Sequence, residues 1–374
     1  MRQVVVSGFL LWFALVQSTT AVGQDLIWES MPIESNASLR GLFVLDAEVI
    51  WASGTNGTII HSLDQGRQWH VQQVPGAEKL DFRDLHVFDK QNILAMTSGT
   101  PARLYRSADG GTSWKVVFES NDPKVFLDSI AFLNQTNGLV MGDPIDDQLF
   151  LLHSPDAGWT WEQVPQTPKL QSGEAGFAAS GTNMTTIGNS HWAIGLGGDL
   201  PPPPSDEQKQ NQAPKHTTGV ADVKRSRVVI VDAELKDWRI VETPLVRHAS
   251  GGIFSLLFVD SKIGVALGGD YNQPDLAQDQ IALTNDGGAT WTVPTSKQRP
   301  TGFRSGVALW RASSTESSWI AVGTNGTDLS SDQGQTWRRV SDIGFNAVQF
   351  SADGQTGWAV GSNGRIAKWK NATK

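Results

Sequence analysis

The chain has 374 residues, of which 38 are Gly, 15 are Trp and none is Cys; this excludes a disulfide scaffold, a cysteine-ligated metal and a cysteine nucleophile. The formal net charge of −8 disfavours a nucleic-acid binder, because nonspecific affinity for phosphate backbones needs a basic surface. Hydrophobic residues make up 39% of the chain, below the roughly 45–50% of ordinary globular domains, so we expect many short strands joined by turns rather than a helical bundle.

The first 23 residues resemble an export signal. Arg2 supplies a positive charge, an apolar run covers Val4–Val16, and Ala21–Gly23 offers the small residues of a cleavage site. The apolar run is shorter than the roughly 20 residues that a bilayer span needs, which disfavours a membrane anchor. We therefore expect a signal peptide over residues 1–23 and an exported protein that acts in a periplasm or outside the cell, with no membrane insertion after cleavage.

The next feature is a repeat of the pattern Ser/Thr-x-Asp-x-Gly-x-x-Trp. Its aspartates are Asp64, Asp109, Asp156, Asp286 and Asp332, and a degenerate copy ends at Trp238. The Asp accepts hydrogen bonds within its own turn, the Gly allows a positive φ, and the Trp starts the next strand with a large buried area. This pattern is the Asp-box, and it lacks the alternating oxygen ligands and terminal Glu of a calcium loop. We expect these five aspartates to have a structural role.

Each box belongs to a longer unit of strands. Short apolar strands begin the units at Leu39–Phe43, Phe82–Val87, Phe126–Phe132, Ile253–Phe258, Phe303–Leu309 and Phe345–Phe350. A strand, a Gly/Asn turn and a further strand follow, as in residues 50–60, and a fourth strand comes after the box. A unit of four strands in about 45–50 residues has the size of a propeller blade.

Seven such units predict the fold class: an all-β, seven-bladed β-propeller over residues 24–374. The seventh unit stops after its third strand at Trp369, and Leu26–Pro32 resembles the strand that follows each box. We expect this N-terminal strand to complete the last blade, because closure removes the exposed edges of an open sheet. Blade 4 is expected to be irregular, since it carries a polar, proline-rich loop over residues 200–217.

Polar residues are expected to gather at one mouth of the central channel. Because neighbouring strands run antiparallel, the loops entering the innermost strands share a face with the loops between the second and third strands, opposite the Asp-box turns. Aligning the innermost strands places these residues in one column: Arg40, Arg83, Asp128, Arg304 and Asn346. The same rim is expected to carry Glu174, at the start of the innermost strand of blade 4, and Asp143, Asp146, Asp270 and Tyr271.

This rim is the candidate binding site, because charged groups that converge on a concave surface are characteristic of ligand sites. The alternative is that ring symmetry brings polar groups to every channel mouth, where they pair with one another and with water. For a binding function, the predicted contact residues are Arg40, Arg83, Arg304, Asp128 and Asp270. The sequence shows no His cluster with metal-ligand spacing and no dinucleotide-binding Gly motif, so we expect neither a metal nor a cofactor.

A second hypothesis assigns part of this rim to catalysis of the sialidase type. Sialidases use three arginines to clamp a carboxylate, a Tyr nucleophile with a Glu partner, and an acidic proton donor. The candidates are Arg40, Arg83 and Arg304 for the clamp, then Tyr271 with Glu174, and Asp143. Against this hypothesis, the Arg-Ile-Pro motif of sialidases is absent, and repeat symmetry alone explains the spacing of the arginines.

Five short phrases add to the repeats: Phe82–Asp84, Gly142–Pro144, Gly173–Ser180, Gly268–Tyr271 and Gly302–Ser305. With these phrases, the chain from Gln24 onward resembles the photosystem II stability/assembly factor-like family of β-propellers. The resemblance implies an exported, non-catalytic scaffold that binds a protein partner, with a membrane complex among the candidates. The alternative function is a glycoside hydrolase of sialidase type, or a lyase, that acts on an acidic glycan. A module that binds a glycan without turnover is a third reading.

Overall fold

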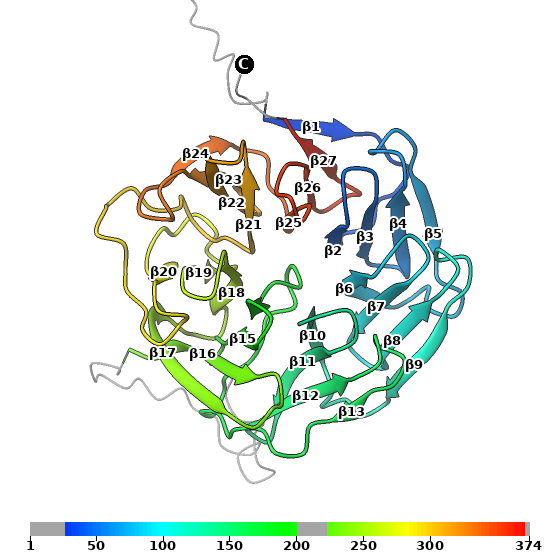
Figure 1. The fold of residues 1–374 in the computed structure, drawn as a ribbon, viewed down its shortest axis with the longest axis horizontal. Helices are drawn as coiled ribbons and strands as arrows, with labels where there is room; N and C mark the ends of the chain where they lie inside the picture. The colour runs from blue at the N-terminus through cyan, green and yellow to red at the C-terminus, as the bar shows by residue number, and fades with distance from the viewer. Residues whose placement is uncertain (1–26, 200–222, 371–374) are drawn as a thin grey trace, which may run out of the picture.

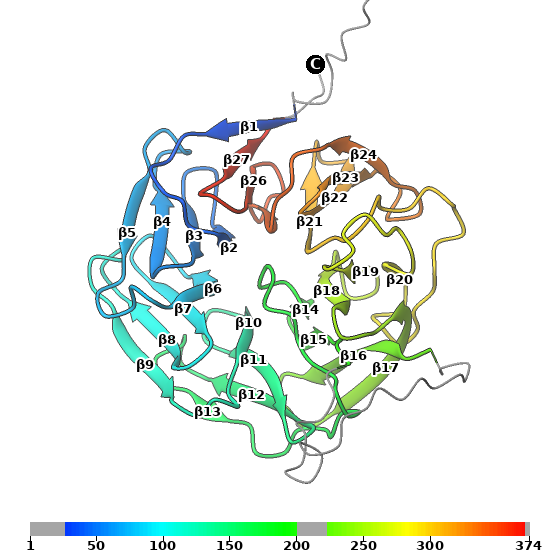
Figure 2. The same cartoon turned by 180° about the vertical axis from the view of Figure 1, so that it is seen from behind.

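The computed structural model describes residues 27–199 and 223–370, and the predicted signal peptide and proline-rich loop lie outside these residues. Seven small antiparallel sheets form a ring around a central channel (Figures 1 and 2). The predicted all-β, seven-bladed propeller is therefore confirmed. Over the two described ranges, no helix has the length and apolar character needed to cross a membrane.

Each of the first four blades has four strands, which follow one another from the channel outwards. Blade 1 has β2 (Leu39–Val44), β3 (Ile50–Gly54), β4 (Thr58–Ser62) and β5 (His70–Gln73). Blade 2 has β6 (Asp81–Val87), β7 (Ile93–Ser98), β8 (Ala102–Ser107) and β9 (Lys115–Ser120). Blade 3 has β10 (Leu127–Phe132), β11 (Gly138–Ile145), β12 (Gln148–Ser154) and β13 (Glu162–Gln163). Blade 4 has β14 (Met184–Ile187), β15 (His191–Gly195), β16 (Arg225–Asp232) and β17 (Trp238–Val246).

The remaining blades complete the ring. Blade 5 has β18 (Gly251–Phe258), β19 (Gly264–Asp270) and β20 (Ile281–Thr284). Its fourth strand is reduced to a bridge between Leu283 and Thr292. Blade 6 has β21 (Gly306–Arg311), β22 (Ser317–Gly323), β23 (Gly326–Ser330) and β24 (Arg338–Ser341). Blade 7 has β25 (Ala347–Phe350), β26 (Gly357–Val360), β27 (Ile366–Trp369) and β1 (Trp28–Met31).

The N-terminal strand closes the ring, as predicted. β1 pairs antiparallel with β27, with Trp28 opposite Trp369 and Met31 opposite Ile366. The Trp28 ring packs edge-on against Trp369, with ring centroids 4.9 Å apart, and its Nε1 donates to Thr327 Oγ1 of blade 6 at 3.1 Å. Closure therefore buries a large aromatic side chain and also ties the last blade to its neighbour.

The hydrophobic core is a ring of seven clusters, and each cluster lies between two neighbouring blades. For example, Trp51 of blade 1 packs with Phe82 and Ile93 of blade 2, and all three side chains are fully buried. Each sheet buries both of its faces in this way, which explains why the inner strands are almost continuously apolar.

The Asp-box turns repeat one hydrogen-bond pattern. In all five boxes, the Asp carboxylate accepts two hydrogen bonds at 2.8–2.9 Å. One comes from the Ser or Thr hydroxyl two residues before the Asp, and the other comes from the backbone N–H four residues after it. The box Gly has a φ of 80–83°, and its N–H donates to the same Ser or Thr hydroxyl. The Asp carboxylate and the Ser or Thr hydroxyl thus satisfy backbone N–H groups of the turn from within the box.

The connection from β13 to β14 takes an unexpected path. Residues 171–183, here named the channel loop, reach into the centre of the ring (Figure 1). The Ser180 hydroxyl donates to the carbonyl oxygen of Ser305 at 2.5 Å, and Thr182 and Ser255 share a hydrogen bond of 2.7 Å. The prediction that Glu174 starts the innermost strand of blade 4 is wrong, because that strand begins at Met184 and the preceding residues are used for these contacts across the channel.

Candidate functional site

A cavity of about 400 Å³ opens at the centre of the ring, where the innermost strands begin. We call it the channel-mouth cavity. Blades 1, 2, 5, 6 and 7 and the channel loop all contribute to its lining: Arg40, Arg83, Phe177, Ala178, Ala179, Phe254, Tyr271, Phe303, Ser305, Thr324, Asn346 and Ser362. None of these residues belongs to an Asp-box, so the cavity and the box turns are distinct parts of the molecule.

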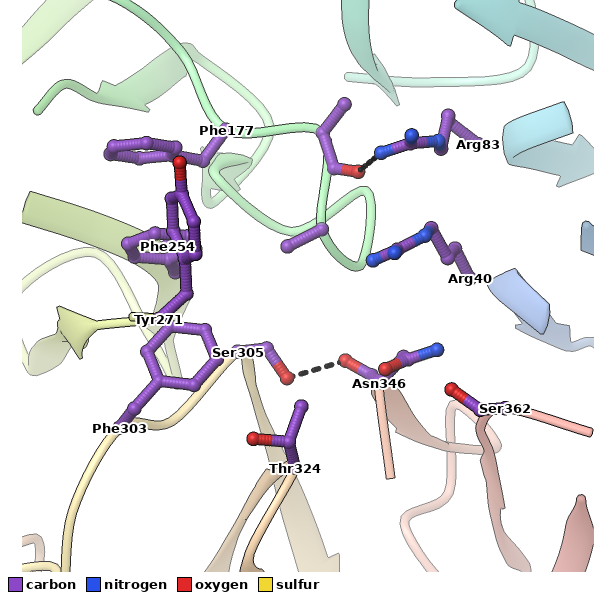
Figure 3. Close-up of a pocket in the computed structure, with 12 residues that line it drawn as sticks. Arg40, Arg83, Phe177, Phe254, Tyr271, Phe303, Ser305, Thr324, Asn346 and Ser362 are labelled. Atoms are coloured by element: carbon purple, nitrogen blue, oxygen red, sulfur yellow. Dashed lines mark hydrogen bonds between the residues drawn. The ribbon is translucent and has the colours of Figure 1, made fainter. Parts of the chain in front are cut away.

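One wall of the cavity is cationic (Figure 3). The guanidinium of Arg83 donates from Nε to Asp81 at 2.6 Å and from Nη1 to the carbonyl oxygen of Ala178 at 2.8 Å, which fixes the channel loop to blade 2. Arg40 lies beside it, and its buried Nε has no hydrogen-bond partner among the described residues. Burial, and next the positive charge of Arg83, lower the pKa of Arg40.

The opposite wall is aromatic (Figure 3). The rings of Phe177 and Phe254 stack with centroids 3.9 Å apart and an interplanar angle of 11°. Phe303 meets Phe254 edge-on at 4.7 Å, and Tyr271 approaches both Phe177 and Phe254 edge-on at 6.3 and 6.2 Å. Tyr271 remains 49% exposed, so this wall offers apolar surface to a ligand.

The floor between the two walls is neutral and polar. Asn346 donates from Nδ2 to the carbonyl oxygen of Leu39 at 2.8 Å, and its own carbonyl oxygen accepts the hydroxyl of Ser305 at 2.6 Å. Thr324 and Ser362 complete this part of the lining. The floor therefore ties blade 7 to blades 1 and 6 and adds no charge that would neutralise the arginines.

Two carboxylates lie behind the channel loop. Asp143 accepts a hydrogen bond from the N–H of Gly176 at 3.0 Å, whereas neither carboxylate oxygen of the fully buried Asp128 has a hydrogen bond of good geometry with the residues that the structure describes. Burial, and next the Asp143 charge, raise the pKa of Asp128 well above its usual value, although Arg83 and the N–H of Ala178 oppose this shift. Burial also raises the pKa of Asp143 to about 6. Neither residue lines the cavity, but both support the loop that does.

Arg304 has the same position in its blade as Arg40 and Arg83 but a different environment. Its side chain is fully buried and forms an ion pair with the fully buried Asp328, with Nη2 and Oδ2 2.5 Å apart. Nε donates to the same oxygen at 2.8 Å, and Nη1 donates to Asn325 Oδ1 at 2.7 Å. Arg304 does not line the cavity, and all of its polar contacts hold blade 6 together.

The remaining predicted site residues lie around the cavity or away from it. Asp270 is buried next to Tyr271 and accepts the N–H of Asn272 at 2.9 Å; burial raises its pKa, but hydrogen bonds, first from Ser250, lower it overall. The carboxylate of Glu174 forms an ion pair with Arg227, with its Oε1 2.7 Å from Nε. Asp146 forms an exposed ion pair with Lys124 at 3.0 Å.

The set of residues that sialidase chemistry needs is not assembled in one place. Arg304 is bound to Asp328 and Glu174 is bound to Arg227, so neither side chain faces Tyr271 in the cavity. Within the part of the chain that the structure describes, no group of three or more His, Asp and Glu side chains is placed to hold a metal ion.

Tyr271 was predicted on the rim, but the three phenylalanines of the aromatic wall were not predicted as site residues. Phe254 and Phe303 were assigned only as strand residues, and Phe177 lies in a loop whose path depends on contacts across the ring. For Arg304, a signal was present in the sequence. The third strand of blade 1 holds Ile59 and Ile60, whereas the matching strand of blade 6 holds Asp328, and a carboxylate in a buried strand needs a cationic partner.

Comparison with known proteins supports the predicted family. Residues 81–199 match the family model described as photosynthesis system II assembly factor YCF48. No curated protein matches the chain at a significant level. Together with the two YCF48 structures described next, the family match confirms the resemblance to the photosystem II assembly factor-like β-propellers.

Three solved structures share the fold. YCF48 bound to D1 peptide is 16% identical, with 91% of this chain and 96% of that chain covered and a TM-score of 0.60. YCF48 from Cyanidioschyzon merolae is 15% identical, with 92% and 98% covered and a TM-score of 0.57. The structure of U3-55K is 11% identical, with 93% and 100% covered and a TM-score of 0.57. At such low identity these structures show a common propeller fold and nothing more about function.

Proposed function

Because the chain resembles the photosystem II assembly factor-like β-propellers, we propose that it is an exported, non-catalytic scaffold that binds a protein partner through the channel-mouth cavity. One structure with the same fold, YCF48, was solved with a D1 peptide bound, which supports a protein as the class of partner. Arg40 and Arg83 are the residues proposed to make the principal contacts. Arg304 and Asp128 support the site from behind, and Asp270 borders it.

The cationic wall is the observation that carries this proposal. Two guanidinium groups lie in one concave site; Arg83 forms an ion pair with Asp81, and Arg40 forms none with the carboxylates of the described residues. The chain as a whole is acidic, with a net charge of −8, so this local excess of positive charge stands out against the rest of the molecule. A site of this kind binds a carboxylate-bearing segment through charge-assisted hydrogen bonds.

The absence of Cys from the sequence allows a clean test by site-specific crosslinking. Thr324→Cys and Ser362→Cys place a thiol-linked photo-crosslinker in the cavity lining, and Gln68→Cys places it in an Asp-box turn as a control. We expect a protein from native membrane and periplasmic extract to crosslink to both cavity positions and not to the control. The crosslink should disappear when Arg40→Gln and Arg83→Gln are added.

Two results would contradict the proposal. Equal crosslinking at the cavity and at the control position would mean that the cavity is not the docking site. Turnover of a fluorogenic sialoside or a polyuronate by the same preparation would favour the glycosidase or lyase alternative. Export is tested separately by the mass of the mature protein, which should begin at Gln24 if the signal is cleaved after Gly23.

A further inference from the structure

The channel-mouth cavity has two walls of different chemistry, and this difference restricts what can occupy it. We infer that the docking segment of the partner is a peptide that inserts an aromatic side chain against the aromatic wall and places a carboxylate from an adjacent position on Arg40. The inference rests on the proposed function, and it specifies the chemistry of the segment that the cavity recognises.

The carboxylate follows from the state of the cationic wall. Arg83 already makes two hydrogen bonds, to Asp81 and to the carbonyl oxygen of Ala178. Arg40 is half-buried next to this guanidinium, and its Nε has no hydrogen-bond partner among the described residues. A half-buried guanidinium that forms no ion pair with the described residues loses hydration without full compensation, and an acidic ligand would offset that loss.

The aromatic side chain follows from the opposite wall. The stacked rings of Phe177 and Phe254 and the edge-on ring of Phe303 fix one another, so this wall is preorganised. Tyr271 stands beside them with nearly half of its surface exposed. Rings in such an arrangement favour a further ring that packs edge-to-face, and they give little orientation to an aliphatic chain.

The size of the cavity fits a short segment of peptide. A volume of about 400 Å³ lies near the lower end of the roughly 300–1,000 Å³ of small-ligand sites. The space accepts one large side chain and its flanking groups, and it is too small for a helix or a folded surface. Figure 3 shows the labelled aromatic rings and the two arginines on opposite sides of this space.

Binding of synthetic peptides to the purified protein tests the inference. The probe is the fluorescently labelled hexapeptide Gly-Ser-Phe-Asp-Ser-Gly with an amidated C-terminus, compared with forms in which Ala replaces the Phe or Asn replaces the Asp. We expect each replacement to weaken binding by about tenfold. A peptide that ends in Phe with a free C-terminal carboxylate distinguishes a terminal from a side-chain source of the charge.

Two variants assign each preference to its wall. Tyr271→Ser should remove the preference for Phe over Ala while the preference for Asp over Asn remains, and Arg40→Gln should do the reverse. Trp159→Ala, which removes an exposed aromatic side chain from an Asp-box turn, is the matched control and should change neither preference. Tyr271→Phe should retain the preference for Phe.

The outcomes separate this inference from the proposed function. Equal affinity for all the peptides, or no saturable binding of any, overturns the inference. If the peptides fail in this way but the cavity still crosslinks to a protein partner, the inference is overturned and the proposed function stands. If the cavity crosslinks to no partner but the peptides bind with the expected preferences, the inference holds as a peptide site and the scaffold proposal fails.

Discussion

The Asp-box turns and the channel mouth are both built from positions that recur in every blade, yet they differ in how alike their contacts are. The five box aspartates make the same two hydrogen bonds at the same distances. At the channel mouth, Arg40, Arg83 and Arg304 have equivalent positions and three different environments. A repeated position with repeated contacts stabilises the fold, whereas a repeated position with divergent contacts is free to serve a local purpose.

The largest effect is expected at Arg304, where the comparison separates stability from binding. Arg304→Gln leaves the fully buried Asp328 without its cationic partner. We expect the free energy of unfolding to fall by about 3–5 kcal/mol, as for other broken buried ion pairs. Arg83→Gln, at the equivalent but partly exposed position, should cost less than about 1 kcal/mol. Urea denaturation of both variants measures the difference.

A double variant controls for the size of the substituted side chain. Arg304→Met combined with Asp328→Leu removes both charges and keeps much of the volume, so it should recover most of the lost stability. If the double variant is as unstable as Arg304→Gln alone, the arginine stabilises blade 6 through its other contacts and not through the ion pair.

The next effect concerns the carboxylates behind the channel loop. The folded pKa of Asp143, about 6, lies above its usual value of 3.8, so the folded state holds a proton that the unfolded chain has lost between these pH values. Stability therefore falls as pH rises through this window, and the loss is complete above it. Asp143→Asn keeps an acceptor for Gly176 without the charge, and it should be more stable than the parent above pH 6 by up to about 3 kcal/mol.

Denaturation at pH 4 and pH 7.5 checks this prediction. The advantage of Asp143→Asn should be small at the lower pH and larger at the higher pH, because only the ionised carboxylate is unfavourable there. The neighbouring Asp128 titrates together with Asp143, so the midpoint belongs to the pair of carboxylates. An advantage that does not vary with pH would mean that the substitution acts through packing.

A smaller effect is expected in the Asp-box turns. Ser330→Ala removes the buried hydroxyl that accepts the N–H of Gly334 and donates to Asp332. A buried N–H without a partner should cost about 1–2 kcal/mol. The adjacent Ser331→Ala changes an exposed hydroxyl and should be neutral in thermal unfolding. If the five turns are equivalent in energy, as they are in geometry, replacing the hydroxyl residue of any other box with Ala should lower the free energy of unfolding by a similar amount.

The smallest effect on stability is expected at Arg40. Burial and the charge of Arg83 both disfavour its guanidinium, so Arg40→Gln should change the free energy of unfolding by less than about 0.5 kcal/mol. The same substitution should weaken peptide binding. A large loss of stability in Arg40→Gln would assign this residue to the fold and would remove the contrast with Arg304.

The fold could be predicted from the sequence because its signals are local. Each Asp-box is complete within eight residues, and Leu26–Pro32 carries the pattern of the strand that blade 7 lacks. The start of blade 4 could not be predicted in this way. Residues 171–183 form no strand of their own, and their path is set by partners such as Ser305 and Ser255 that lie on other blades.

The site was less predictable for the same reason. Sequence alignment of the blades placed Arg40 and Arg83 on the correct rim, because the position of a residue along a strand fixes the end of the ring at which it lies. The same alignment did not predict the contact between Phe177 and Phe254, whose stacked rings join the channel loop to blade 5. The burial of Arg304 was also not predicted, because it depends on a single carboxylate, Asp328, at a strand position that is apolar in blade 1.

The pairing of β1 with β27 also has a consequence in time. These two strands are separated by more than 330 residues of sequence, so blade 7 cannot be completed until the chain has been made as far as Trp369. At roughly 5–20 residues per second, β1 waits unpaired for on the order of tens of seconds. During that interval the growing ring has an uncovered flank at each end. The fraction of molecules that reach the closed ring would therefore depend on how fast the remaining chain is made, or on a chaperone that covers these flanks.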